Sequence, residues 1–311
     1  MKKLTLSEFI SAYRIAYCIP FLMACITGLV PALQINHLWI SSIIIFIEIF
    51  LFAMFVNLSN DYFDYKSGID KLKFKKDNEL QEKLYGKVLN ETVYWKGNAI
   101  DIGYISQKQL KIVLFIIAGL LLILSIPLII NLGYIVLILG LSGFFLSFFY
   151  TAPPLSLSSK GLGEVDVFLS FSMISFFSYY VQVQEFNLLV LLLSLVVGLG
   201  TFIMRFVDEM TGFEAHKIIG EKDISVRLGI KKSIKIVKIL IVVLYILSIV
   251  ISIINPWFAL LFLTLPLPVK IFKIYNSKDE LKVYKIVPLM FKLNFLMPLL
   301  IIISWIMQSV L

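Results

Sequence analysis

Four side chains that offer oxygen ligands follow one another closely near residue 60. Asn57, Asn60, Asp61 and Asp64 stand three or four residues apart, so they share one face if a single helix runs through them. Carboxylate and amide oxygens are hard ligands that suit Mg²⁺, which typically takes one or two carboxylates together with waters and substrate phosphates. The spacing therefore predicts a Mg²⁺ site for a phosphorylated substrate. Asn60, Asp61 and Asp64 are its candidate catalytic and metal-binding residues.

Neighbouring residues extend this candidate site. Gly68 and Asp70 follow the helix, and Asp70 is a further candidate metal ligand. The candidate substrate-binding residues nearby are Asn57, Tyr62 and Lys66. The alternative is that the polar side chains only cap the helix and meet water. A lone aspartate would favour that explanation, whereas two asparagines and two aspartates on one face favour a binding site.

A second run of charged residues spans 205–229. Its acidic members Asp208, Glu209 and Glu214 are candidate ligands of a second ion. Its candidate phosphate-binding bases are Arg205, Lys217, Lys222 and Arg227. For any single base, the usual excess of Lys and Arg on the inner flank of a membrane protein is the alternative explanation. His216 on its own is more typical of an exposed loop histidine than of a metal ligand.

The composition indicates a membrane protein. The 311 residues are 59% hydrophobic and 15% charged, whereas soluble domains are about 45–50% apolar and about 25% charged. Apolar blocks such as 112–130 and 234–254 are about 20 residues long, the length that crosses roughly 30 Å of hydrocarbon. A soluble helical core would need amphipathic stripes, and these blocks are apolar on nearly every side. We therefore expect one all-α, polytopic membrane domain over residues 1–311.

Apolar runs and their breaks predict a bundle of about nine transmembrane helices. The expected spans are 15–34, 38–59, 110–130, 133–150, 165–182, 188–207, 234–254, 257–275 and 286–308. With the N-terminus in the cytoplasm, the outward segments are 34–37, 131–133, 182–187, 255–256 and 308–311. None of the 28 Lys and Arg residues lies in these outward segments. This asymmetry is typical of the positive-inside rule and favours an odd number of spans.

The same topology locates the function. Most of the hydrophilic residues lie in two inward loops, at about 60–109 and 205–233, so we expect the site at the cytoplasmic face of a multi-pass protein of the cell membrane. The net charge of +8 would suit nucleic acid, but the charges alternate with the spans. The expected partner is therefore the lipid bilayer, and no nucleic acid is expected.

These two loops resemble the UbiA superfamily of intramembrane aromatic prenyltransferases. Asn60, Asp61, Asp64, Gly68 and Asp70 match, in order, the family's Asn-Asp-x-x-Asp element and the Gly-x-Asp that often follows it in the branch acting on 1,4-dihydroxy-2-naphthoate. The supporting matches to that branch are Gly103-Tyr104-Ile105-Ser106, Tyr150-Thr151-Ala152-Pro153-Pro154-Leu155, Lys160-Gly161-Leu162-Gly163-Glu164 and Val226-Arg227-Leu228-Gly229. The resemblance covers nearly the whole chain.

The second motif departs from the family. It usually presents two aspartates four residues apart, upstream of a Gly-Lys pair and the Val-Arg-Leu-Gly element. Counting back from Gly229, those two positions hold Gly212 and His216, and the expected lysine is Glu221. Either Asp208, Glu209 and Glu214 replace the missing pair, or this member binds its metal differently, or it has lost the standard activity.

The resemblance implies transfer of a polyprenyl group from its diphosphate to an aromatic acceptor, 1,4-dihydroxy-2-naphthoate in menaquinone biosynthesis. It further implies Mg²⁺ ions at both motifs, with Lys66, Lys217 and Arg227 on phosphate oxygens. The acceptor, the prenyl length, and whether the chain acts alone or as a homo- or hetero-oligomer stay open.

Two other functions stay open. A non-catalytic paralogue that partners a complete enzyme would explain the altered second motif. A secondary transporter also has polar groups in its spans, but near the membrane midplane on interrupted helices. Here the carboxylates gather at one face. Glu48, the clearest exception, is expected to pair within the bundle.

Overall fold

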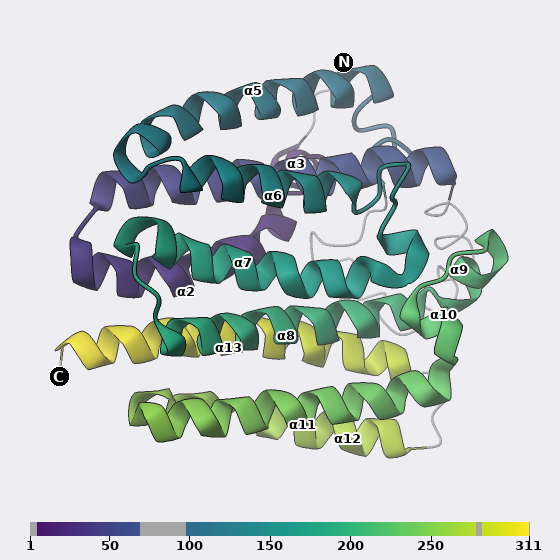
Figure 1. Cartoon of the computed structure of the whole chain (residues 1–311). Coiled ribbons are helices and arrows are strands. Elements are labelled where there is room, and N and C mark those ends of the chain that lie inside the picture. Colours follow the sequence, from purple (N-terminus) through teal and green to yellow (C-terminus); the bar gives the residue numbers. More distant parts are fainter. Residues whose placement is uncertain (1–4, 69–97, 278–281, 311) are drawn as a thin grey trace.

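The computed structural model describes residues 5–68, 98–277 and 282–310, and within these ranges all regular structure is helical. Figure 1 shows long helices lying side by side and roughly antiparallel. The long elements are α2 (Ile19–Asn36), α3 (Trp39–Ser67), α5 (Gln107–Leu132), α6 (Ile135–Phe149), α7 (Gly163–Val183), α8 (Leu188–Thr211), α11 (Ile230–Ile254), α12 (Pro266–Asn276) and α13 (Lys282–Val310). The short ones are α1 (Leu6–Ala12), η1 (Ile15–Cys18), η2 (Ser158–Leu162), α9 (Phe213–Ile219), α10 (Ile224–Leu228) and η3 (Pro256–Thr264).

The expected all-α membrane fold is confirmed. In the described part of the chain, eight helical segments are long and apolar enough to cross a membrane. The ninth expected span coincides with α6, which is apolar but only 15 residues long, shorter than the roughly 20 residues that a perpendicular span needs. The prediction of about nine spans is therefore close to the eight observed.

Local signals fix several helix ends. Ser106 and Gln109 form a capping box at the start of α5, in which each side chain bonds the other residue's backbone N–H. The Gly103–Ser106 stretch is therefore the entry to a helix. Gly68 ends α3 in the left-handed conformation, with φ 75°, which glycine adopts without steric cost.

The central layer of the bundle consists of α2, α7, α8 and α13, whose buried side chains form the main apolar core with those of α11. Small polar residues tie these helices together within it. Thr27 of α2 bonds Ser175 of α7 at 2.7 Å, and Ser175 bonds Ser194 of α8 at 2.9 Å. Small residues at such contacts let helix backbones approach closely.

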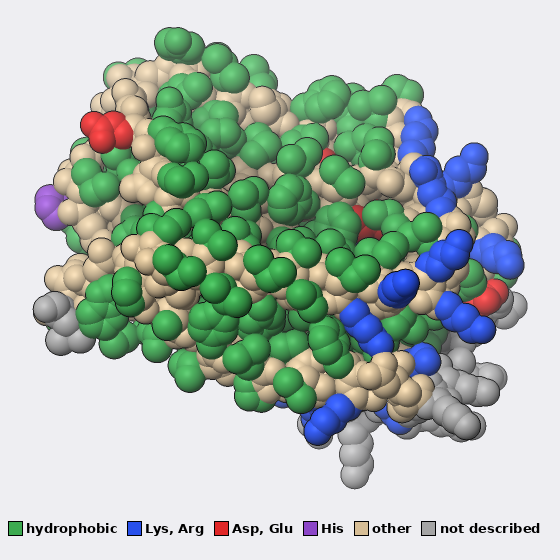
Figure 2. Space-filling view, turned by 60° about the horizontal axis from the view of Figure 1, so that its bottom comes forward, with side chains coloured by type: hydrophobic (Ala, Val, Ile, Leu, Met, Phe, Trp, Pro, Cys, Tyr) green, Lys and Arg blue, Asp and Glu red, His purple; other side chains and the backbone are tan. Residues whose placement is uncertain are grey.

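The charges are strongly polarised along the bundle. Figure 2 shows Lys and Arg side chains gathered at one end of an otherwise apolar surface, the end at which α9 and α10 lie in Figure 1. We call this the basic end. The ends of α3 and α8 and the start of α7 lie there as well. The assignment of this end to the cytoplasm stays a prediction.

Replacing Gly28 with alanine tests the contact between α2 and α7. A Cβ there would stand 2.0 Å from the carbonyl oxygen of Ser175, so the two helices would have to move apart. We expect Gly28→Ala to lower the free energy of unfolding by about 1–3 kcal/mol, the usual cost of overpacking, measured as a lower thermal midpoint in detergent. Gly119→Ala is the matched control, because a Cβ there meets nothing within 4 Å. Equal midpoints would contradict this close approach.

Candidate functional site

The first candidate cluster lies on the last turns of α3. This helix runs without a break from Trp39 to Ser67, so Asn57, Asn60, Asp61 and Asp64 stand on one continuous helical surface, as their spacing predicts. Asp61 is buried and Asp64 is half-buried. The structure thus keeps these oxygen ligands together at the basic end of the bundle. Asp70 lies outside the described residues.

Asp61 forms an ion pair with Arg14, a residue that was not among the predicted site residues. Arg14 donates two hydrogen bonds to its carboxylate, Nε to Oδ2 and Nη2 to Oδ1, both at 2.7 Å. Asn98 also donates to the backbone carbonyl of Asp61 at 2.7 Å. Arg14 is the only Lys or Arg between Lys3 and Lys66, and this isolated charge is the sequence signal that could have revealed the pair. A two-pronged guanidinium–carboxylate pair fixes the orientation of both groups.

Asn60 connects α3 to the segment that follows α6. Its Oδ1 accepts a hydrogen bond from Thr151 Oγ1 at 2.9 Å. One turn earlier, Asn57 Nδ2 is buried and has no hydrogen-bond partner among the described residues. Tyr62 lies towards α5. The Nζ atoms of Lys66, on α3 itself, and of Lys111, on α5, stand 4.9 and 5.5 Å from the centre of its ring.

The second cluster begins on the last turns of α8. Arg205 bonds Asp208 at 3.1 Å and pairs with Glu209 one turn further on. Its guanidinium also lies 5.8 Å from the centre of the Tyr150 ring, within the range of a cation–π contact. Tyr150 and Thr151 are adjacent, so one short segment contacts both candidate clusters, Asn60 through Thr151 and Arg205 through Tyr150.

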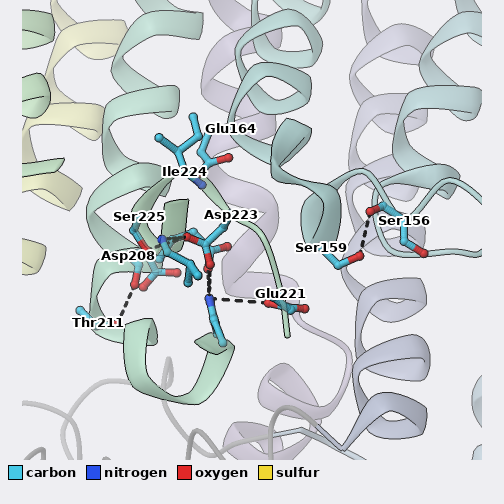
Figure 3. A network of polar contacts seen from close by, with 12 residues as sticks. Ser156, Ser159, Glu164, Asp208, Thr211, Glu221, Asp223, Ile224 and Ser225 are labelled. Carbon is cyan, nitrogen blue, oxygen red and sulfur yellow. Dashed lines mark hydrogen bonds and ion pairs between the residues drawn. The ribbon is translucent and has the colours of Figure 1, made fainter. Parts of the chain in front are cut away.

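His216 is buried, so its predicted exposure is wrong. Only 3% of it is accessible, and its Nδ1 lies 2.7 Å from Asp223, 3.1 Å from Glu209 and 3.6 Å from Glu221. In Figure 3, dashed lines run from one nitrogen to Asp223 and to Glu221. The tertiary fold returns Glu221 and Asp223 towards α8, which local sequence does not reveal. The sequence signal that could have revealed Asp223 is its position three residues before Val226, which is typical of an aspartate that caps the start of a helix.

Asp223 has two structural partners besides the histidine. It begins α10 as its N-cap, accepting from the backbone N–H of Val226 at 2.9 Å and from Ser225 Oγ at 2.6 Å. Burial raises the pKa of this carboxyl, but the hydrogen bonds from His216, Ser225 and Val226 outweigh burial and lower it. Burial raises the pKa of Glu221, and His216 offsets this only in part. Asp223 is thus held in its charged form.

The remaining predicted residues lie at the surface of this region. Glu214 and Lys217 are exposed on α9. Arg227 is exposed and bonds the carbonyl oxygens of Lys222, at 2.6 Å, and Lys160. Gly161 is required at this contact, because its φ is 77° and a Cβ would stand 2.2 Å from the Lys222 carbonyl oxygen.

The donor sets of the two clusters differ. Asn60, Asp61 and Asp64 offer only oxygen, which fits Mg²⁺. The second cluster brings Glu209 together with a ring nitrogen and Asp223, and Asp208 points to Arg205. The three predicted acidic ligands are therefore in different surroundings. Asp208 bonds Arg205, Glu209 lies beside the imidazole of His216, and Glu214 is at the surface.

A family model links the chain to known proteins: the UbiA prenyltransferase family model matches residues 97–296. A 2-carboxy-1,4-naphthoquinone phytyltransferase of Synechocystis sp. is 30% identical over 194 residues, which are 62% of this chain and 56% of the relative. A 1,4-dihydroxy-2-naphthoate octaprenyltransferase of Bacillus subtilis is 23% identical over 223 residues, which are 70% of this chain and 65% of the relative. The match thus spans less than two thirds of either relative.

Solved structures share the fold. A UbiA homologue of Archaeoglobus fulgidus, bound to DMAPP and Mg²⁺, superimposes with a TM-score of 0.63 at 14% identity, covering 95% of this chain and 99% of the other. The apo structure of a UbiA homologue of Aeropyrum pernix K1 gives a TM-score of 0.64 at 12% identity, covering 95% and 98%.

Removing Arg14 tests the ion pair with Asp61. Loss of one partner leaves a buried charge uncompensated, which costs about 3–5 kcal/mol, so we expect Arg14→Met to lower the thermal midpoint markedly. The double variant Arg14→Met/Asp61→Asn should recover most of that loss, because no bare charge remains. Lys66→Met, at an exposed base of α3, is the control. A double variant no more stable than the single one would argue against the pair.

A cycle of substitutions at Gly212 and His216 tests their steric coupling. A Cβ at Gly212 would stand 2.5 Å from His216 Nε2. We expect Gly212→Ala alone to cost about 1–3 kcal/mol of stability through overpacking. In a His216→Asp background the same change should cost little, since the ring is gone. Thermal unfolding of the four proteins measures the coupling, and additive effects would refute it.

Proposed function

This chain belongs to the UbiA prenyltransferase family, and from that premise we propose that it transfers a polyprenyl group from its diphosphate to an aromatic acceptor. The acceptor we propose is 1,4-dihydroxy-2-naphthoate, on the way to menaquinone. The names of the two curated relatives, both naphthoate-type prenyltransferases, support that choice. The observation that carries the proposal is the Tyr150–Thr151 segment, which contacts the oxygen ligands on α3 and the base on α8.

The reaction needs a cation at the leaving diphosphate. Mg²⁺, when bound, neutralises the charge that builds on the diphosphate as the allylic C–O bond breaks. Asn60, Asp61 and Asp64 would hold it, with Asp70 as a further candidate. Arg14 orients Asp61 for this task by its two hydrogen bonds.

The chain's own bases supply further positive charge. Arg205 Nε is buried and has no hydrogen-bond partner in the described ranges, so it offers a donor to a phosphate oxygen. Lys66, at the end of α3, is exposed beside Tyr62. Lys217 and Arg227 stand on the outer side of the second cluster, and Arg227 already bonds two carbonyl oxygens. We therefore assign the inner diphosphate contact to Arg205.

Aromatic side chains line the bundle beside Asn60. The Tyr62 and Phe63 rings meet edge to face at 5.2 Å, and Phe63 meets Phe148 at 6.1 Å. Such faces attract a cation by about 0.5–2 kcal/mol each, and they exclude water from the allylic cation. The electron-rich acceptor ring then forms the new C–C bond, and in the naphthoate branch its carboxyl leaves as CO₂.

The apolar substrate explains the bundle. A polyprenyl chain can lie among lipid-like side chains while its diphosphate stays at the charged end. We propose that this end faces the cytoplasm, with the N-terminus on the same side, as the Lys and Arg distribution favours.

A transporter is less consistent with the contacts. Glu48, the carboxylate within α3, accepts a hydrogen bond from Ser125 at 2.8 Å, so it pairs within the bundle as expected. A non-catalytic partner subunit remains the second candidate function, because Gly212 and His216 stand where two aspartates are usual.

Asp64→Ala tests the first metal site. We expect Mg²⁺-dependent release of pyrophosphate, from a prenyl diphosphate and 1,4-dihydroxy-2-naphthoate, to fall on the order of a hundredfold or more, since a metal ligand is lost. Membrane insertion should be normal, because no span is disturbed. Glu185→Gln, at an exposed carboxylate of the α7–α8 loop, is the control. If Asp64→Ala kept activity within a few-fold of the parent, the proposed Mg²⁺ site on α3 would be wrong. No turnover by the well-folded parent with any acceptor would favour the partner-subunit function.

A further inference from the structure

Three carboxylates converge on one nitrogen of His216. Its Nδ1 lies 2.7 Å from an Asp223 oxygen and 3.1 Å from a Glu209 oxygen, and Glu221 follows at 3.6 Å. A ring N–H carries one hydrogen, so one proton cannot serve all three carboxylates. Metal–ligand bonds of about 2.0–2.2 Å put neighbouring ligand atoms about 3 Å apart. One ligand atom each from Glu209, His216 and Asp223 lies within 4.8 Å of the others, close enough for the three to share a cation.

The surroundings hold more negative than positive charge. Glu164, Glu209 and Asp223 are at least 95% buried, and Asp208 and Glu221 are half-buried. The ion pairs among these described residues involve two bases, Arg205 and His216. Burying an uncompensated carboxylate costs several kcal/mol. A divalent cation would balance the excess.

A second observation points to the same cation. Glu164, only 1% exposed, accepts from the backbone N–H of Ile224, the residue after Asp223, at 3.3 Å. Its other oxygen, Oε2, is buried and lacks a hydrogen-bond partner in the described part of the chain. This buried, unpartnered oxygen belongs to the residue that bonds the start of α10, so it adds an unused acceptor to the same region.

The donor types select the class of ion. Imidazole nitrogen suits zinc, copper, iron and nickel, whereas all-oxygen sets suit magnesium, calcium and manganese. Mg²⁺ also demands near-ideal octahedral geometry and gives up its waters reluctantly. A buried set of one nitrogen and two carboxylates therefore fits a first-row transition ion better than Mg²⁺. Gly212 belongs to the same arrangement, because it leaves room for the ring.

We propose that Glu209, His216 and Asp223 bind one divalent transition-metal ion of the Co²⁺ or Zn²⁺ class. The three ligands come from the end of α8, from α9 and from the N-cap of α10. The ion would therefore join three elements at the basic end and hold Glu209 where it pairs with Arg205. Ligand geometry alone supports this site, whether or not the chain has prenyltransferase activity.

Cobalt binding tests the proposal without any prenyl substrate. Full-length protein, purified in detergent without a histidine tag and stripped by chelator, is titrated with Co²⁺ and followed by visible absorption. We expect one equivalent of Co²⁺ to give ligand-field bands typical of a site with a nitrogen ligand, and excess Mg²⁺ should not remove them. Bound Co²⁺ should also raise the thermal midpoint of the protein. In His216→Gln the bands should vanish and affinity fall at least about tenfold, since even outer-shell partners of metal ligands contribute about 10–100-fold.

Matched variants separate this site from other ions. His37→Gln removes the chain's other histidine, which is exposed at the end of α2 away from the basic end, and should leave the bands unchanged. Asp64→Asn should also keep them, because it alters only the first cluster. His216→Asp, which supplies an oxygen ligand in place of the ring nitrogen, should fold but bind Co²⁺ more weakly than the parent. Identical Co²⁺ spectra and affinities for the parent and His216→Gln would overturn the site.

Discussion

A carboxylate buried at the end of an apolar bundle needs a cation within a few ångströms, because its desolvation costs several kcal/mol. This constraint shapes the basic end of the protein. Arg14 compensates Asp61, Arg205 compensates Glu209, and His216 meets Asp223. The first pair joins the N-terminal segment to α3, the second lies within the last turns of α8, and the third joins α9 to α10. The ion pairs therefore order the polar ends of helices whose apolar lengths are held by packing.

The same pairs explain how one site can draw on two distant parts of the chain. The oxygen ligands of α3 and the base of α8 never bond each other in the described contacts; each instead contacts one of two adjacent residues, Thr151 and Tyr150. One short segment thus lies between the cluster on α3 and the cluster on α8. Such an arrangement suits a diphosphate, which needs a metal on one side and a fixed base on another. It also suits an apolar prenyl chain, since the Phe63 ring, three residues after Asn60 on α3, meets the Phe148 ring edge to face.

Local patterns predicted the helices well and their mutual contacts poorly. Apolar length and the absence of charge are properties of a short window, so every expected span coincides with an apolar helix. The stripe from Asn57 to Asp64 was readable for the same reason, because i, i+3 and i, i+4 spacing is local. Arg14 lies 47 residues from Asp61, and no window contains both. His216 was placed at the surface because its neighbours Glu221 and Asp223 return to it only after the chain turns at Gly220.

The contact between Gly212 and His216 also bears on the order in which substitutions at these two positions can occur in evolution. The imidazole fills the space that a side chain at position 212 would need. A side chain at 212 together with histidine at 216 is therefore strained by about 1–3 kcal/mol, whereas glycine at 212 with an aspartate at 216 is not. A lineage that passed between an aspartate pair and the present pair avoids this strain if it loses the first side chain before it gains the ring, and a return avoids it by removing the ring first. The route through glycine at position 212 is thus the one with the smaller loss of stability in either direction.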